Sequence, residues 1–384
     1  MSGLSLCRRV LTRLTIILAA ASVFSMLQPS YAQGIAVSTG NSSPTAQPSS
    51  ALTQPFKSAH PAQVGLALPS DGALSTLSGV NKSRADELWK AYETHIGAPM
   101  MKWAASEIEF KPGGAVFYPF SGPDFVTVSS LFPNAGRYIM VAMQAGGAPA
   151  QLAAMPAPRQ QAFQAKFLRE WAKFSRLGFF RTDDLNEDLR DKQAYIGTTT
   201  ILMTFAHYMG YEVKDVHPIA LDEASGEFVR SDQAPWKSVR LVLSKSGRSA
   251  TIDYVSADLS DGYLSQAHSM RAWLQKQSSH PVLLKAASHL LQESYFSVLR
   301  DMIVANAPMV VQDETGLNYT YLEKMGKVQL YGGFLYPHEL FNRNKQASLA
   351  QAYKSANDVK PLPFGFSYNK SPERRSIQVV KRQP

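Results

Sequence analysis

Residues 115–124, Ala115-Val-Phe-Tyr-Pro-Phe-Ser-Gly-Pro-Asp124, decide the fold that the sequence predicts. Val116 to Phe120 is a short run of β-branched and aromatic residues, which is typical of a buried strand. Ser121 to Asp124 forms a tight turn, and the apolar residues that follow recur at helical spacing until Pro133. Tyr138 to Met143 is a second apolar strand. The stretch therefore predicts a strand, a helix and a second strand, with a polar turn where ligands of open α/β sheets bind.

Strand and helix patterns alternate along the rest of the chain, which predicts an α/β fold. We expect a single domain at residues 76–369, with a mostly parallel, Rossmann-like central sheet and helices on both faces. Ser238–Leu243 and Ala250–Ala257 flank a Ser-Gly turn and predict one antiparallel hairpin. Pro158–Lys192 reads as a helical insertion over one mouth of the sheet. Pro361–Phe366 is expected to be a terminal edge strand, where prolines are tolerated.

The two ends of the chain differ in composition from the expected domain. Residues 1–32 combine a basic start, an apolar run at Leu14–Leu27 and a small-x-small site at Ser30–Ala32, which is the pattern of a secretory signal peptide. We therefore expect a mature start near Gln33, in the periplasm or outside the cell. Residues 33–75 are rich in Ser, Thr, Pro and Gln and predict a disordered linker. Residues 370–384 are expected to be a basic tail.

Charge and cysteine content exclude some classes of function. The only cysteine is Cys7, inside the predicted signal, so the mature chain is expected to have no disulfide, no thiol nucleophile and no cysteine metal site. The net charge is +9, but no basic stripe lies inside the domain, and we expect no nucleic-acid partner. The basic tail could contact an anionic surface, or it could be a solvated segment that favours solubility.

Polar turns follow three of the predicted strands, and they define the candidate site. If the strands are parallel, Asp124, Asp258, Asp261 and Asp313 gather at one edge of the sheet. Such carboxylates could bind a hard cation or perform acid–base chemistry, and they could equally cap helices and turns. No metal site is assigned. The full candidate ligand-binding set is Tyr118, Ser121, Gly122, Asp124, Phe125, Asp258, Ser260, Asp261 and Asp313, with Tyr118 and Phe125 as apolar walls.

Catalytic motifs are absent from this set. No G-x-S-x-G occurs, and Ser121 would need His280, His289 or His338 brought close by the fold to act as a nucleophile. The first unit is similar in topology to Rossmann-like methyltransferases. Those enzymes carry a glycine-rich first turn and an acidic residue at the end of the second strand, whereas this chain has Gly122 alone and Gln144. We therefore do not expect S-adenosylmethionine, and no other cofactor is indicated.

Three segments carry a closer resemblance. Tyr118–Phe125 with Phe132–Ala135, the turn Asp258–Asp261, and Val359–Gly365 resemble a family of exported bacterial proteins without assigned activity. The resemblance implies one exported domain. Two functions stay open: a ligand-binding or scaffolding protein that meets a small molecule or an envelope component, and a periplasmic enzyme, either a hydrolase or a degenerate methyltransferase, that uses the carboxylate-lined crevice.

Overall fold

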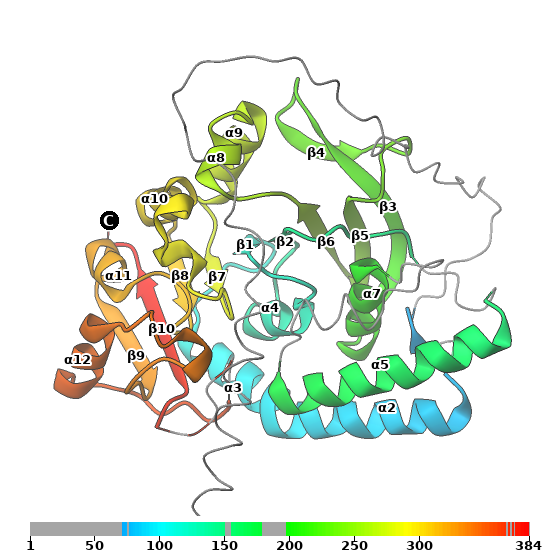
Figure 1. The fold of residues 1–384 in the computed structure, drawn as a ribbon, viewed down its shortest axis with the longest axis horizontal. Coiled ribbons are helices and arrows are strands. Elements are labelled where there is room, and N and C mark those ends of the chain that lie inside the picture. The colour runs from blue at the N-terminus through cyan, green and yellow to red at the C-terminus, as the bar shows by residue number, and fades with distance from the viewer. Residues whose placement is uncertain are drawn as a thin grey trace, which may run out of the picture. The chain divides into compact units, whose positions relative to one another are not determined.

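The computed structural model describes residues 71–74, 77–149, 155–178, 197–365, 368, 371 and 373–383. The described chain forms an α/β fold around one ten-stranded mixed sheet, whose strand order is β4-β3-β5-β6-β2-β1-β7-β8-β10-β9 (Figure 1). The strands are β1 Ala115–Pro119, β2 Arg137–Ala142, β3 Glu212–Asp222, β4 Glu227–Arg230, β5 Ser238–Lys245, β6 Arg248–Ser256, β7 Val282–Leu284, β8 Met309–Gln312, β9 Val328–Gly332 and β10 Ser376–Lys381.

Helices of different lengths connect these strands. The α-helices are α2 Gly79–Tyr92, α3 Ala98–Glu107, α4 Phe125–Leu131, α5 Ala157–Leu177, α7 Thr198–Tyr208, α8 Asp261–Leu264, α9 His268–Gln277, α10 Ser297–Asn306, α11 Tyr319–Met325 and α12 Ala347–Ser355. A π-helical turn, η3 Glu93–Gly97, joins α2 to α3, and short 3-10 helices lie at η5 Leu290–Gln292, η6 Ser294–Phe296 and η7 Glu339–Phe341. None of the described helices is long and apolar enough to cross a membrane.

The centre of the sheet is parallel. β6, β2, β1, β7 and β8 pair in parallel, so their carboxyl ends all lie at one edge. The first crossover is the predicted unit: β1, then α4, then β2, with Ala115 beside Arg137 in register. The chain passes from β1 to β2 on one side of β1, and β7 lies on the other side of β1. The loops after β1 and β7 therefore leave this edge of the sheet in different directions.

Helices cover both faces of the sheet because its central strands are apolar at successive residues, which point to opposite faces. Tyr118 and Tyr138 point into one core with residues of α2, α3, α4, α5 and α7. Phe117 and Ile139 point into the other core with α8, α9, α10 and α11. A smaller cluster holds α12 against β9. In Figure 1, α2 and α5 lie side by side, and Trp171 of α5 donates a hydrogen bond to the Ala85 carbonyl of α2 (3.1 Å).

Antiparallel pairing is more extensive than the sequence predicts. Besides the predicted hairpin β5–β6, β3 pairs with both β4 and β5, and β10 pairs with both β8 and β9. The expectation of a mostly parallel sheet with one hairpin is therefore wrong for the outer strands of the described chain. The physical reason on the β4 side is the tight turn between Asp222 and Glu227, which returns the chain directly; β4 has only four residues and carries no strong strand pattern.

Two further expectations are corrected near the C-terminus. Pro361–Phe366 forms no strand over its described residues, and the only pairing there is a single bridge between Tyr331 and Lys360, because prolines 361 and 363 have no N–H to donate. Within the expected basic tail, Ser376–Lys381 forms β10, buried between β8 and β9. The helical insertion is described only as α5, and residues 179–192 of that prediction lie outside the described residues.

The position of β10 gives a first prediction. The side chain of Ile377 is fully buried in the core, so Ile377→Ala should lower the free energy of unfolding by about 2–5 kcal/mol. Gln383→Ala, at an exposed position in the same segment, should leave it within about 0.5 kcal/mol of the wild type. Urea denaturation measures both. Equal stability of the two variants would mean that residues 376–381 are a solvated tail.

Candidate functional site

A pocket of about 360 Å³ lies at the carboxyl ends of β1, β2 and β7. Its walls come from the loops after these three strands and from a C-terminal segment around η7. The lining residues are Tyr118, Phe120, Ser121, Gly122, Pro123, Asp124, Ala142, Met143, Gln144, Lys285, Ala286, Ala287, Ser288, Leu290, Leu340, Phe341 and Tyr368. This volume is in the range of small-molecule sites.

The turn after β1 forms one wall. Phe120 and Gly122 have φ angles of 58° and 51°, in the left-handed region. The turn is held there because the Ser121 N–H donates to the Val141 carbonyl at the end of β2 (3.0 Å). Asp124 then caps α4, and its Oδ1 accepts from the Thr127 N–H (3.3 Å). A bulky residue such as Phe120 seldom adopts this conformation, and such residues concentrate at functional sites.

The loop after β7 forms the opposite wall and is held in a similar way. Ala286, Ser288 and His289 have φ angles of 50°, 51° and 60°. Asp313, which follows β8, accepts the Ala286 N–H with its Oδ2 (2.9 Å), and Thr315 Oγ1 accepts the Ala287 N–H (2.7 Å). The loop therefore holds three left-handed residues within four positions, because the side chains of Asp313 and Thr315, which follow β8, bind its backbone.

A buried ion pair closes the base of the pocket. Lys285, directly after β7, is 1% exposed, and its Nζ donates to Asp124 Oδ2 (2.8 Å), Thr127 Oγ1 (2.9 Å) and the Gly178 carbonyl (2.7 Å). An ammonium group has three N–H donors, so these three bonds use all of them. The pair joins β7, the start of α4 and the end of α5 at one point.

Tyr118 completes this network from inside β1. Its hydroxyl donates to Asp124 Oδ2 (3.0 Å). Burial, and next the negative charge of Asp124, raise the pKa of Tyr118 far above its usual value. The phenol therefore stays protonated at physiological pH and acts as a hydrogen-bond donor to the carboxylate.

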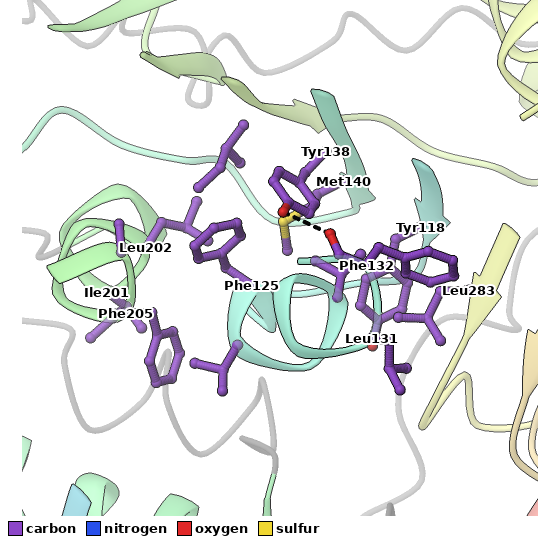
Figure 2. Close-up of a cluster of buried hydrophobic side chains, with 14 of the residues drawn as sticks. Tyr118, Phe125, Leu131, Phe132, Tyr138, Met140, Ile201, Leu202, Phe205 and Leu283 are labelled. Atoms are coloured by element: carbon purple, nitrogen blue, oxygen red, sulfur yellow. Dashed lines mark hydrogen bonds between the residues drawn. The ribbon is translucent and has the colours of Figure 1, made fainter. Parts of the chain in front are cut away.

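The structure brings only part of the predicted set together. Tyr118, Ser121, Gly122 and Asp124 line the pocket, whereas Asp258, Ser260, Asp261 and Asp313 do not. Phe125 is a core residue and not a pocket wall: Figure 2 shows it beside Tyr138 and Leu202, and its ring meets the Tyr138 ring edge-on at 5.1 Å. The turns do share one edge of the sheet, because β1, β6 and β8 are parallel.

Each remaining aspartate has a local partner. Asp258 is exposed, and its Oδ1 accepts the Ser260 N–H (2.8 Å). Asp261 accepts the backbone N–H groups of Ser297 (3.0 Å) and Val298 (2.9 Å) at the start of α10. Among the residues that the structure describes, no three His, Cys, Asp or Glu side chains come together as a metal site. Asp258 and Asp261 thus cap a turn and a helix. This is the structural role that their sequence context allows, besides cation binding or acid–base chemistry.

Ser121 has no base beside it in the described chain. Its hydroxyl donates to the Gly122 and Val141 carbonyls (3.1 and 3.4 Å). His280 precedes β7 and so lies at the opposite edge of the sheet, while His338 caps η7 through its Nδ1. His289 is fully buried, with its ring centroid 4.9 Å from that of Phe341. The serine-hydrolase arrangement is not formed by these residues.

Lys285 is a residue of the candidate site that the sequence did not predict. Its only signal is a lysine directly after the apolar run Pro281–Leu284, which is too short to stand out as a strand. The aromatic wall formed by Phe341 and Tyr368 carries no sequence signal either, because Phe341 ends the short helix η7, Tyr368 lies in a loop, and both are more than 200 positions from β1.

A second, larger hollow of about 520 Å³ lies between the β3–β5 extension and the α8–α9 region. Its acidic and basic lining residues, Glu223, Lys237 and His268, are exposed. The described residues that line it form no buried ion pair of the kind formed by Asp124 and Lys285. We therefore take the smaller pocket, with its fixed polar base, as the candidate functional site.

The buried pair predicts strong coupling between its members. Lys285→Met or Asp124→Leu alone should lower the free energy of unfolding by about 3–5 kcal/mol, because each leaves the other charge buried without its partner. The double variant should lose much less than the sum of the two single losses. Urea denaturation of the four proteins measures this, with Asp258→Asn, at an exposed cap, as the matched control. Additive losses would show that the two charges are not paired.

His289 predicts a pH dependence of stability. Burial lowers its pKa, although the nearby charge of Asp313 opposes this effect, as do Gln292 and Glu293, while Arg343 adds to it. Since the folded state binds the proton less readily, the stability is complete above the unfolded pKa of about 6.5 and falls as the pH drops below it. The free energy of unfolding should therefore decline more steeply between about pH 7 and pH 5 in the wild type than in His289→Asn. Parallel pH profiles would contradict this.

Comparison of the chain with models of protein families, with curated proteins and with solved structures finds no match in any of the three. What the pocket can bind follows from its own side chains.

Proposed function

We propose that the protein is a ligand-binding protein of the cell envelope, with a Rossmann-like domain that holds an uncharged small molecule in the pocket between the β1 and β7 loops. The observation that carries this proposal is the internal neutralisation of Asp124 by Lys285 at the base of that pocket. Export to the envelope is supported by the signal-peptide pattern of residues 1–32.

The strand order supports the Rossmann-like assignment and the choice of pocket. Numbered by their order along the chain, the five parallel strands β6, β2, β1, β7 and β8 run third, second, first, fourth and fifth across the sheet. This is the order in the first part of the Rossmann sheet, in which ligands bind outside the carboxyl ends of the strands where the order reverses. In this chain that point lies between β1 and β7.

The charges of the lining residues favour an uncharged ligand. Among the described lining residues, Asp124 and Lys285 are the only side chains that carry a full charge, and they meet at 2.8 Å with all ammonium donors used. A charged ligand would lose its hydration in the pocket without gaining an unpaired opposite charge. Neutral hydrogen-bonding groups remain: Gln144 and Ser288 are half-buried, and among the described residues their side chains have no hydrogen-bond partner.

The rim supports a ligand with an apolar or ring-shaped part. Met143 and Leu340 line the pocket while they are 54% and 52% exposed, which is unusual for large apolar side chains beside a hollow. Phe341 and Tyr368 add aromatic surface, with ring centroids 5.0 Å apart and edge-on packing. Apolar walls with a few polar groups are the common composition of small-molecule sites.

Binding is favoured over catalysis because the reactive groups are occupied. Lys285 has its three donors engaged, Tyr118 is held protonated, and the Ser121 hydroxyl faces backbone carbonyls. The methyltransferase alternative is weakened at two positions: Gln144 stands where a carboxylate would meet a ribose, and Pro123 has no N–H to offer in the turn.

A panel of matched ring compounds tests the proposal. Each ring is supplied as an amide or alcohol, as a carboxylate and as an amine, and binding to the mature protein is measured by calorimetry and thermal shift. We expect a neutral member to bind, and we expect no binding of the charged members or of the sulfonium S-adenosylmethionine. Gln144→Leu should weaken the neutral ligand about tenfold, as the loss of a hydrogen bond worth about 1.4 kcal/mol requires.

The control is Gln275→Leu, which changes an exposed glutamine of α9 outside the pocket. It should leave the affinity unchanged. Tight binding of a charged member of the panel, or equal effects of the two glutamine variants, would contradict the proposed site.

A further inference from the structure

The opposite edge of the sheet has a separate hollow, formed where the parallel strands begin. It measures about 270 Å³ and lies between the loops before β1 and β2 and the β5–β6 turn. Its lining residues are Pro112, Gly113, Pro133, Asn134, Ala135, Gly136, Tyr211, Lys245, Arg248, Ser249 and Ala250. It shares no residue with the pocket between the β1 and β7 loops, so what it binds is independent of the function proposed above.

Two cations line this hollow, and both are held by neutral groups. Lys245 Nζ donates to the Met209 carbonyl (2.6 Å) and lies 5.1 Å from the centre of the Tyr211 ring. Arg248 Nη1 donates to Asn134 Oδ1 (2.6 Å). Among the described residues neither cation forms an ion pair, and no Asp or Glu lines the hollow.

The surrounding backbone holds Asn134, the partner of the exposed Arg248 side chain. The Gly113 N–H donates to the Asn134 carbonyl (2.7 Å), which holds the residue that orients Arg248. A Cβ on Gly136 would come within 2.7 Å of the Gly113 carbonyl oxygen, so the two loops touch through glycine backbone. The wall is therefore built from main chain, and Lys245 and Arg248 project from the neighbouring hairpin.

The two like charges disfavour each other. Burial lowers the pKa of Lys245, and the charge of Arg248 lowers it further. A bound anion stabilises a partly buried cation that lies beside another cation and has no carboxylate partner. The attraction between cation and anion offsets the free energy that the cation loses on desolvation. Lysine and arginine with exposed N–H donors are also the usual partners of phosphate oxygens.

We propose that this hollow is an anion site, in which Lys245 and Arg248 bind a phosphate-class oxyanion, either free or as the monoester group of a larger molecule. Within the described part of the chain, one donor of Lys245 and one of Arg248 form hydrogen bonds, with Met209 and Asn134, which leaves the others for the anion. The hollow is large enough for a phosphate group, and its opening near the β5–β6 turn leaves room for a substituent.

The test is a titration of the mature protein with inorganic phosphate and, in a second arm, with glycerol 1-phosphate, at constant ionic strength. Phosphate should raise the melting temperature of the wild type and bind with measurable heat. Lys245→Met and Arg248→Met should each weaken binding at least tenfold. Lys214→Met is the matched control, because Lys214 lies on the adjacent strand β3 and is paired with Glu212 (2.6 Å).

The two arms distinguish the sources of the oxyanion. Tighter binding of the monoester indicates a phosphorylated ligand, and equal or weaker binding indicates free phosphate. Should Lys245→Met fail to fold, the side-chain NMR titration of Lys245 in the wild type gives the same information: phosphate should raise its pKa. An unchanged Lys245 pKa in phosphate, or equal phosphate affinity of Lys245→Met, Lys214→Met and the wild type, overturns the proposal.

Discussion

The ion pair between Lys285 and Asp124 is the interaction on which the rest of the site depends. It joins three elements that are far apart in sequence: the end of β7, the N-terminal cap of α4 and the end of α5. A buried charge pair of this kind adds little net stability, since desolvation offsets its attraction, but losing one partner is costly. Its main effect is geometric, because only one arrangement of the three elements satisfies both charges.

In the proposed function, the same pair determines which ligands the pocket accepts. A free lysine after β7 would attract anions, and a free aspartate in the β1 turn would attract cations. Because each neutralises the other, the remaining polar groups of the walls, Gln144 and Ser288, can act only through hydrogen bonds. The left-handed residues of the two loops lie beside these groups. Phe120 and Ser288 have disfavoured conformations, and groups at the ends of β2 and β8 bind the neighbouring backbone N–H groups of Ser121 and Ala286.

Much of the centre of the fold could be predicted from sequence because its signals are local. The run before Ser121, the Asp124 cap and the stop at Pro133 define β1, α4 and the approach to β2 without any knowledge of the rest of the chain. β7 has only three residues, and β10 lies in a segment whose charged ends indicate a tail. Neither can be assigned without the neighbours that pair with them.

In the candidate site, too, residues of one local segment could be predicted from the sequence, whereas contacts between distant segments could not. Tyr118, Ser121 and Asp124 belong to one turn, and its position at the sheet edge follows from the β1–α4–β2 unit. Asp258 and Asp261 follow a strand at the same edge, but β2 separates that strand from β1, and the carboxylates bind their own loop and α10. Sequence spacing shows which edge a turn occupies, whereas the strand order decides which turns meet.

The most direct test of the central claim compares one ring carboxylate with the wild type and with Asp124→Asn, in which Lys285 loses its counter-charge. Calorimetry on the folded proteins measures both affinities, and circular dichroism verifies that the variant is folded. If the pair neutralises the pocket, the wild type will not bind the carboxylate measurably and the variant will bind it. Equal affinity of the two proteins for the carboxylate would contradict the claim that Asp124 and Lys285 set the charge preference of the site.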